Sequence, residues 1–186
     1  MTTNDSYSEF FATVLSPAQS AGAGLTAFIV LPKAASEKLP RRGRVSVDGS
    51  INGQPFVATL EPDGQLSHWL ALSERLLAGA GANIGSEARL HIAALKQEPE
   101  PEVPADLQQA LAASAEASAV WHDTTTIARL DWIHWITSAK QAKTRAKRIN
   151  DACNMLAEGK RRVCCFDPSG FYSKAFSAPK AADDTL

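Results

Sequence analysis

The sequence of 186 residues lacks several features that define whole classes of protein. No apolar run approaches the roughly 20 residues that span a bilayer, and the N-terminal residues lack the positive flank and apolar stretch of a signal peptide. Cysteine is scarce: three residues, two of them adjacent, do not make the even, spaced set of a disulfide scaffold and suit a reducing compartment. We therefore expect a soluble, cytoplasmic protein without a membrane span.

The chain also has no large excess of charge of one sign, because its 19 Lys and Arg residues nearly balance its 20 Asp and Glu residues. This balance excludes a uniformly basic nucleic-acid-binding protein and a long acidic tail. With 45% hydrophobic residues the composition is that of a globular protein, and the length allows one ordinary domain or two small ones. We expect two small domains.

The common catalytic and cofactor-binding motifs are absent too. There is no Gly-x-Gly-x-x-Gly after a strand, no phosphate loop ending in Gly-Lys-Ser/Thr, no Gly-x-Ser-x-Gly elbow and no His-Glu-x-x-His. The four histidines are scattered without a pair at helical spacing: His68, His91, His122 and His134. We therefore expect no catalytic residue, cofactor or metal site, and the sequence favours a binding protein over an enzyme.

The first half of the chain is predicted to form strands, because short β-branched and aromatic runs alternate with Gly, Pro and Asn. The clearest signal is a hairpin at Asn52-Gly53, since these residues favour the positive φ angles of a tight turn. Two short helices are expected, at 32–39 and, after an N-cap at Ser73, at 74–78. The six expected strands cover 9–15, 25–31, 43–50, 54–60, 66–72 and 88–95. Six short strands with two small helices favour closure into a small β-barrel.

An acidic, Pro-rich stretch at 97–104 predicts a linker, because alternating Pro forbids a helix and like charges extend the chain. Beyond it the apolar period becomes helical, and we expect three helices at 105–119, 126–139 and 140–158, the last ending at Gly159. The fold class is therefore α+β, with a β-barrel domain at 1–96 and a helical domain at 105–186. This second domain includes an irregular C-terminal tail. We expect its aromatic residues to pack back and the residues from Ala178 onward to be loose; the aromatics are Phe166, Phe171, Tyr172 and Phe176.

Positive charge is concentrated near the last predicted helix. Between Ser138 and Arg162 stand eight basic and two acidic residues, a local net charge of plus six in a chain of net charge minus one. The candidate residues for binding an anion or partner are Lys140, Lys143, Arg145, Lys147 and Arg148. Helical spacing places the basic residues opposite a predicted buried face of Ala142, Ala146, Ile149, Cys153 and Leu156. Such a face can hold an anionic ligand, nucleic acid or an acidic protein, or it can be a solvated surface paired with the acidic linker.

Cys164 and Cys165 are the candidate reactive thiols. Adjacent cysteines in an extended segment point to opposite faces and form a poor zinc chelate. Nearby Lys160, Arg161 and Arg162 could lower a thiol pKa, which would suit a thiol-dependent enzyme or redox-responsive protein acting at the interdomain region. The alternative is that the pair is structural. Trp132 and Trp135 predict a buried helix, in a core or in a self-association surface, so both a monomer and a homodimer remain open.

The second half resembles the bacteriocin-protection, YdeI or OmpD-associated family. The resemblance rests on Val103–Leu107, on Trp132-Ile133-His134-Trp135-Ile136 followed by Ala139-Lys140, and on Thr144-Arg145-Ala146-Lys147-Arg148-Ile149. The first half resembles the small domain of unknown function that commonly precedes this family, through the residues from Gly43 to Gly53 and Pro55-Phe56. The resemblance implies a bacterial protein whose first domain is a double-split β-barrel capped by helices. It also implies a link to antimicrobial-peptide or envelope-stress resistance, and no catalytic residue comes with it.

Overall fold

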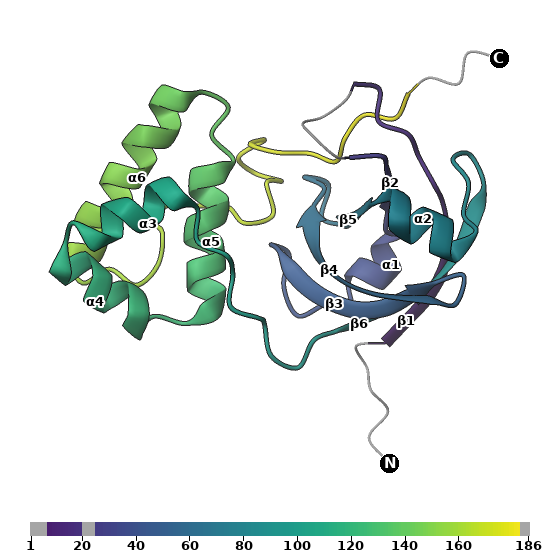
Figure 1. Cartoon of the computed structure of the whole chain (residues 1–186), viewed down its shortest axis with the longest axis horizontal. Coiled ribbons are helices and arrows are strands. Elements are labelled where there is room, and N and C mark those ends of the chain that lie inside the picture. The colour runs from purple at the N-terminus through teal and green to yellow at the C-terminus, as the bar shows by residue number, and fades with distance from the viewer. Residues whose placement is uncertain (1–6, 20–24, 183–186) are drawn as a thin grey trace. The chain divides into compact units, whose positions relative to one another are not determined.

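The structure is a computed structural model that describes residues 7–19 and 25–182 (Figure 1). Residues 1–6, on which the expected absence of a signal peptide rests, and the last four residues of the tail lie outside this range. The chain forms two compact units. The β unit takes in Met1–Lys96 and Ser169–Leu186, and the helical unit takes in Gln97–Pro168. This confirms the predicted α+β class with a β domain followed by helices.

The β unit contains one curled, antiparallel sheet of six strands that forms a half-barrel (Figure 1). The strands are β1 (Tyr7–Thr13), β2 (Ala27–Val30), β3 (Val45–Ile51), β4 (Gln54–Pro62), β5 (His68–Leu72) and β6 (Glu87–Ala94), in the order β1-β6-β3-β4-β5-β2. Leu15 and Phe28 exchange two backbone hydrogen bonds of 2.9 Å, so the two ends of the sheet meet at one point. All six predicted strands are present, and their inward side chains form one apolar core.

Local turn and cap residues fix the elements of the β unit as the sequence predicted. Asn52 and Gly53 have φ values of 48° and 85° and join β3 to β4 in a tight hairpin. Two short helices, α1 (Lys33–Ser36) and α2 (Glu74–Ala80), cover the sheet. The Ser73 side chain caps α2 by accepting from the Leu76 backbone N–H. Asn52 also accepts from the Arg89 N–H at 2.9 Å, so its side chain has a structural role.

The helical unit has four helices where the sequence predicted three. They are α3 (Ala105–Ala112), α4 (Ala115–Asp123), α5 (Thr126–Thr137) and α6 (Ala142–Ala157). The predicted helix over 105–119 breaks because Ser114 leaves the helical conformation and its side chain accepts from the Ala117 N–H at 3.2 Å. Apolar residues from all four helices form a separate core, which includes Leu107, Trp121, Trp132, Ile136 and Leu156. No described helix has the length and apolar character needed to cross a membrane.

The C-terminal segment differs from its prediction, because from Ser169 onward it packs with the β unit and not with the helices. The Ala178 N–H donates to the Asp63 carbonyl at 3.3 Å, and the Ala182 N–H donates to the Ser16 carbonyl at 2.8 Å. The segment is therefore bonded at residues that the sequence suggested would be loose. Tyr172, which we expected to pack back, is 81% exposed. Backbone pairing of this kind depends on exposed N–H and C=O groups and leaves no pattern in side chains.

His68 is fully buried in the β unit and is bonded at both ring nitrogens. Its Nε2 lies 2.9 Å from the Gly43 carbonyl, and because a carbonyl only accepts, Nε2 carries the proton. Nδ1 then accepts from the Ser36 hydroxyl at 2.7 Å. Burial, the largest influence, lowers the pKa of His68 below its ordinary value of 6.5. The folded protein thus holds this imidazole neutral.

We expect the free energy of unfolding to fall as the pH drops below 6.5. In that range the unfolded His68 binds a proton that the folded one does not, so stability rises with pH. Urea unfolding between about pH 5 and pH 7.5 measures this dependence. His68→Gln, which cannot titrate, should flatten the curve, whereas His122→Gln at an exposed position should not. An unchanged slope in His68→Gln would show that another group controls the pH dependence.

Candidate functional site

The sequence suggested that the basic side chains of α6 face the solvent. In the structure, some of them bind to other helices instead. Arg145 makes two hydrogen bonds to the Asp106 carboxylate, of 2.7 and 3.0 Å. This pairing raises the pKa of Arg145 and lowers that of Asp106. Arg148 lies over the Trp135 ring, 5.4 Å from its centre, and donates to the Trp135 carbonyl at 2.5 Å. Two of the five candidate residues therefore tie α6 to α3 and α5.

The buried face of α6 is rotated from its predicted position. Ile149, Ala152 and Leu156 are buried, whereas Ala142 and Ala146, which we expected in the core, are exposed. Arg145 and Arg148 instead face the neighbouring helices, where their guanidinium groups bind Asp106 of α3 and lie over Trp135 of α5. Alanine is small enough to be compatible with either environment, so periodicity alone did not distinguish them.

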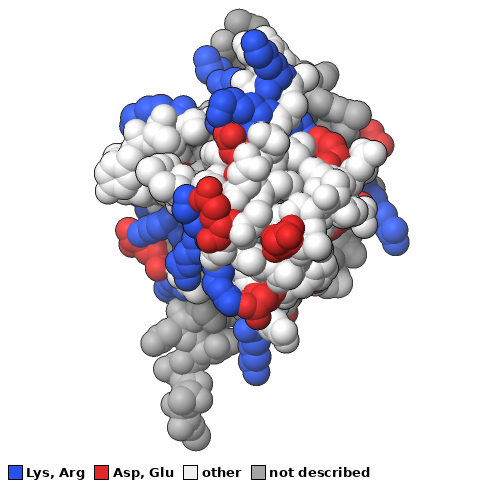
Figure 2. Space-filling model, turned by 90° about the vertical axis from the view of Figure 1, so that its left-hand side faces the viewer, with Lys and Arg blue, Asp and Glu red and all other residues white. Residues whose placement is uncertain are grey.

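Acidic residues compensate much of the remaining charge in this region. Lys147 pairs with Asp151 at 2.6 Å, Lys160 pairs with Glu158 at 3.1 Å, and Arg161 pairs with Asp123. The sequence suggested that the acidic linker pairs with the basic residues near α6. In the structure, Glu100 of the linker binds Arg129 of α5. Figure 2 shows the result as acidic side chains lying among the basic ones on the face in view. Exposed pairs of this kind stabilise the fold weakly but lower the local potential.

Lys140 and Lys143 remain as exposed cations without an ion-pair partner among the described residues. Lys140 precedes the first turn of α6 and Lys143 lies within it, where the backbone N–H groups of residues 142–144 have no carbonyl acceptor within the helix. The Gln141 side chain makes no capping hydrogen bond, and no acidic residue lies in the first turn. A helix of 16 residues thus begins with free donors, the positive end of its dipole and two lysines.

The two candidate thiols lie together in the helical unit, in a turn that follows α6. Cys164 and Cys165 are both exposed, and their Sγ atoms are 3.3 Å apart. The hydrogen bond between the two thiols raises the pKa of Cys165, which is opposite to the effect expected from the nearby cations. The third cysteine, Cys153, lies partly buried on α6, and burial raises its pKa. The described residues contain no group of three or more His, Cys, Asp and Glu side chains placed to hold a metal ion.

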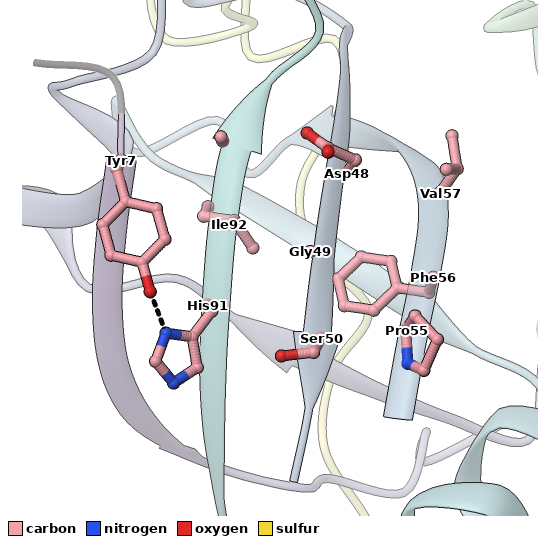
Figure 3. Close-up of a pocket in the computed structure, with 10 residues that line it drawn as sticks. Tyr7, Asp48, Gly49, Ser50, Pro55, Phe56, Val57, His91 and Ile92 are labelled. Carbon is pink, nitrogen blue, oxygen red and sulfur yellow. Dashed lines mark hydrogen bonds between the residues drawn. The ribbon is translucent and has the colours of Figure 1, made fainter. Parts of the chain in front are cut away.

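Sequence reasoning missed a groove of about 650 Å³ on the outer face of the sheet in the β unit (Figure 3). Asp48 and Ser50 of β3 lie at its floor, with Val57 of β4 on one side and Tyr7 and His91 on the other. The Tyr7 hydroxyl is hydrogen-bonded to Nδ1 of His91. The available signal was strand alternation, which places these residues on the solvent side, where Val57 is 68% exposed. The groove combines apolar walls with a few polar groups, as binding surfaces often do.

The comparison with protein families assigns each half of the chain. Residues 100–159 match the family described as bacteriocin-protection, YdeI or OmpD-associated. The family predicted from the sequence is confirmed. The segment that matches this family contains all four helices, α3 to α6. Residues 10–92 match a domain of unknown function, DUF1905, and this segment contains most of the curled sheet. No curated protein matches the chain. Lys140 and Lys143 lie within the YdeI/OmpD-associated match, whereas Cys164 and Cys165 lie beyond both matched segments.

Proposed function

We propose that this YdeI/OmpD-associated protein is a non-enzymatic, cytoplasmic binding protein, and that its partner carries phosphate groups that dock at the start of α6. The single observation behind the proposal is the juxtaposition of Lys140 and Lys143 with an uncapped helix N-terminus. Free N–H groups and the helix dipole favour anions at such a terminus, and phosphate is the anion that they most commonly bind. We name this surface, formed by residues 140–144, the α6 entry.

The neighbouring arginines support the α6 entry without belonging to it. Arg148 donates to the Trp135 carbonyl and to the Ser138 hydroxyl, at 2.5 and 3.2 Å, and so holds the end of α5 against α6. Arg145 holds α6 to Asp106 at the start of α3. Lys140 thus lies in the short segment between α5 and α6, two helices that these contacts hold in place. A partner that binds there therefore does not need to order the surface first.

The partner is expected to be contacted through its backbone or charged groups and not through stacked bases. The candidate basic residues lack interleaved aromatic side chains in the sequence, and Arg148 lies over the nearby Trp135 ring. Nucleic acid, a phosphorylated metabolite and a phosphorylated protein share the required chemistry. The family description supports a role in stress tolerance, which we propose is exerted through this partner and not directly on a membrane.

The test is the affinity for a fluorescent single-stranded oligonucleotide, measured by anisotropy from about 20 to 200 mM salt. We expect log affinity to fall linearly with log salt. The Lys140→Glu/Lys143→Glu variant should bind at least about tenfold more weakly at low salt, with a slope shallower by about 1.4, because about 0.7 is lost for each phosphate contact with a single strand.

The matched control is Lys33→Glu/Lys96→Glu, which changes the net charge equally at two exposed lysines of the β unit. It should keep the wild-type slope if the contact is local to α6. Equal losses in the two variants would mean that only net charge matters. An absence of binding at the lowest salt would reject the phosphate-bearing partner.

A further inference from the structure

The turn at Cys164-Cys165 directs two adjacent thiols to the same side of the chain. In an extended strand, neighbouring side chains point to opposite faces, which was the reason to expect a poor chelate. Here Cys165 has a φ of 59°, in the left-handed region, and the two Sγ atoms approach to 3.3 Å. The expectation of divergent side chains was therefore wrong, and the pair forms a vicinal dithiol at the surface.

Contacts on both sides of this dithiol fix its position in the helical unit. On the N-terminal side, the Arg161 carbonyl accepts from the Thr124 hydroxyl at 3.0 Å and from the Trp132 indole N–H at 3.3 Å. On the C-terminal side, the Phe166 ring packs edge-on against His134, with ring centres 5.4 Å apart. Val163 and Phe166, the residues next to the pair, also line a pocket of about 210 Å³ together with Asp131 and Arg162. The two thiols thus project from an anchored turn.

The sulfur separation decides which kind of ion fits between the thiols. With metal–sulfur bonds of about 2.3 Å, sulfurs 3.3 Å apart subtend an angle of about 92° at a shared ion. A tetrahedral zinc with the same bonds needs sulfurs about 3.8 Å apart and further protein ligands. A pyramidal, trivalent ion with a lone pair has bond angles close to a right angle and needs two protein sulfurs only. Trivalent arsenic has this geometry and prefers sulfur ligands.

We propose that Cys164 and Cys165 form a binding site for trivalent arsenicals. The proposal is independent of the α6 entry, because it uses residues beyond both family matches and a neutral ligand. The reaction is an exchange without a change of oxidation state: arsenous acid and two thiols give a cyclic dithioarsenite that keeps one hydroxyl group, and two water molecules leave. Each S–H bond is replaced by an S–As bond, and each thiol proton leaves with a hydroxide from arsenic.

Oxidation of the pair to a disulfide is the less favourable use of the same thiols. Adjacent Cα atoms lie about 3.8 Å apart across a trans peptide, shorter than the 4.4–6.8 Å that unstrained disulfides span. A bridging arsenic atom does not require the two sulfurs to bond directly, so it fits the Sγ–Sγ separation of 3.3 Å that the turn already has. We therefore expect the reduced pair to capture an arsenical faster than it forms an internal disulfide in air.

The experiment titrates the reduced full chain with phenylarsine oxide, a neutral monoaryl arsenical, and follows intact mass together with the number of free thiols. We expect one adduct per chain, formed with loss of one water molecule, and disappearance of two of the three thiols. Excess glutathione should leave the adduct in place, whereas a small dithiol should remove it. A wild-type chain that gives no adduct, or an adduct that consumes one thiol, would overturn the proposal.

Single substitutions identify the thiols involved. Cys164→Ser and Cys165→Ser should each weaken binding by at least about 100-fold, because the second sulfur acts at high effective concentration. Both positions are exposed, so the far-ultraviolet circular dichroism of these variants should match that of the wild type. Cys153→Ser is the matched control and should keep wild-type affinity. Wild-type affinity in Cys164→Ser, or its loss in Cys153→Ser, would place the site elsewhere.

Discussion

Trp132→Ala should destabilise the helical unit by about 4 kcal/mol, the largest effect that we expect from a single substitution. Trp132 is fully buried at the centre of the helical core and packs edge-on against Trp135, with ring centres 6.1 Å apart. Its indole N–H donates to the Arg161 carbonyl, which helps to hold the segment after α6. Truncation to alanine leaves a large cavity and removes this hydrogen bond.

Urea unfolding of the full chain, followed by the helical circular-dichroism signal, measures the effect. The control is Tyr172→Ala, which removes an aromatic ring that is 81% exposed and should change stability by less than about 0.5 kcal/mol. A loss below about 1 kcal/mol for Trp132→Ala would show that this tryptophan is not at the centre of a cooperative core.

Arg129→Met should cost about 2 to 3 kcal/mol, because one guanidinium connects three segments of the helical unit. It binds both oxygens of Glu100 in the linker, at 2.6 and 2.7 Å, and donates to the carbonyls of Trp121 and Thr124 at the end of α4. The Arg129 side chain is only 12% exposed. Methionine preserves much of the volume, so the loss reports the hydrogen bonds and not a cavity.

Arg89→Met provides the matched control for an ion pair. Arg89 binds Glu9 at 2.6 Å on the sheet surface, with more than 40% of both side chains exposed, and its loss should cost less than about 1 kcal/mol. Equal costs for the two variants would mean that the carbonyls at the end of α4 do not depend on Arg129. Far-ultraviolet circular dichroism and urea unfolding on both variants give the comparison.

The acid dependence of the Arg129 pair offers a second check. The hydrogen bond from Arg129 lowers the pKa of Glu100 below its ordinary value of 4.5. This interaction therefore stabilises the fold above pH 4.5 and is lost as the pH falls through the lowered pKa. In Arg129→Met the stability lost between neutral pH and acid should be smaller than in the wild type.

The elements that the sequence predicted correctly are those set by local chemistry. The Asn52-Gly53 turn, the Ser73 cap and the Gly159 stop each act within a few residues, so single side chains were sufficient to place them. The family was predictable for a similar reason, because its motifs are short and contiguous. Short β-branched and aromatic runs bounded by Gly, Pro and Asn likewise located all six strands.

The features that the sequence did not reveal depend on residues far apart in the chain. Ser114 is also compatible with a continuous helix, but in the structure it caps α4, and α3 and α4 each pack against α6. Ala142 and Ala146 are exposed because Arg145 and Arg148 find partners on other helices. The groove on the sheet requires the strand order that brings β1 beside β6 and β3 beside β4, which alternation within one strand does not specify.

The candidate site was predicted in part for the same reason. Charge density drew attention to the correct helix, yet pairing with Asp106, Asp151 and Trp135 separates the structural cations from the exposed Lys140 and Lys143. The proximity of Cys164 and Cys165 depends on one backbone angle, which the sequence Val-Cys-Cys-Phe does not encode by itself. Pairing and backbone conformation, and not residue type, thus decide which groups are available to a partner.

The most direct test of the proposed function is a nuclear magnetic resonance titration of the labelled full chain with inorganic polyphosphate at low salt. A partner at the α6 entry should shift the backbone amides of residues 142–144 first, since these N–H groups have no acceptor within the helix. The shifts should saturate and should vanish in Lys140→Glu/Lys143→Glu. Shifts confined to the sheet groove around Tyr7 and His91, or unchanged amides at 142–144, would contradict the account.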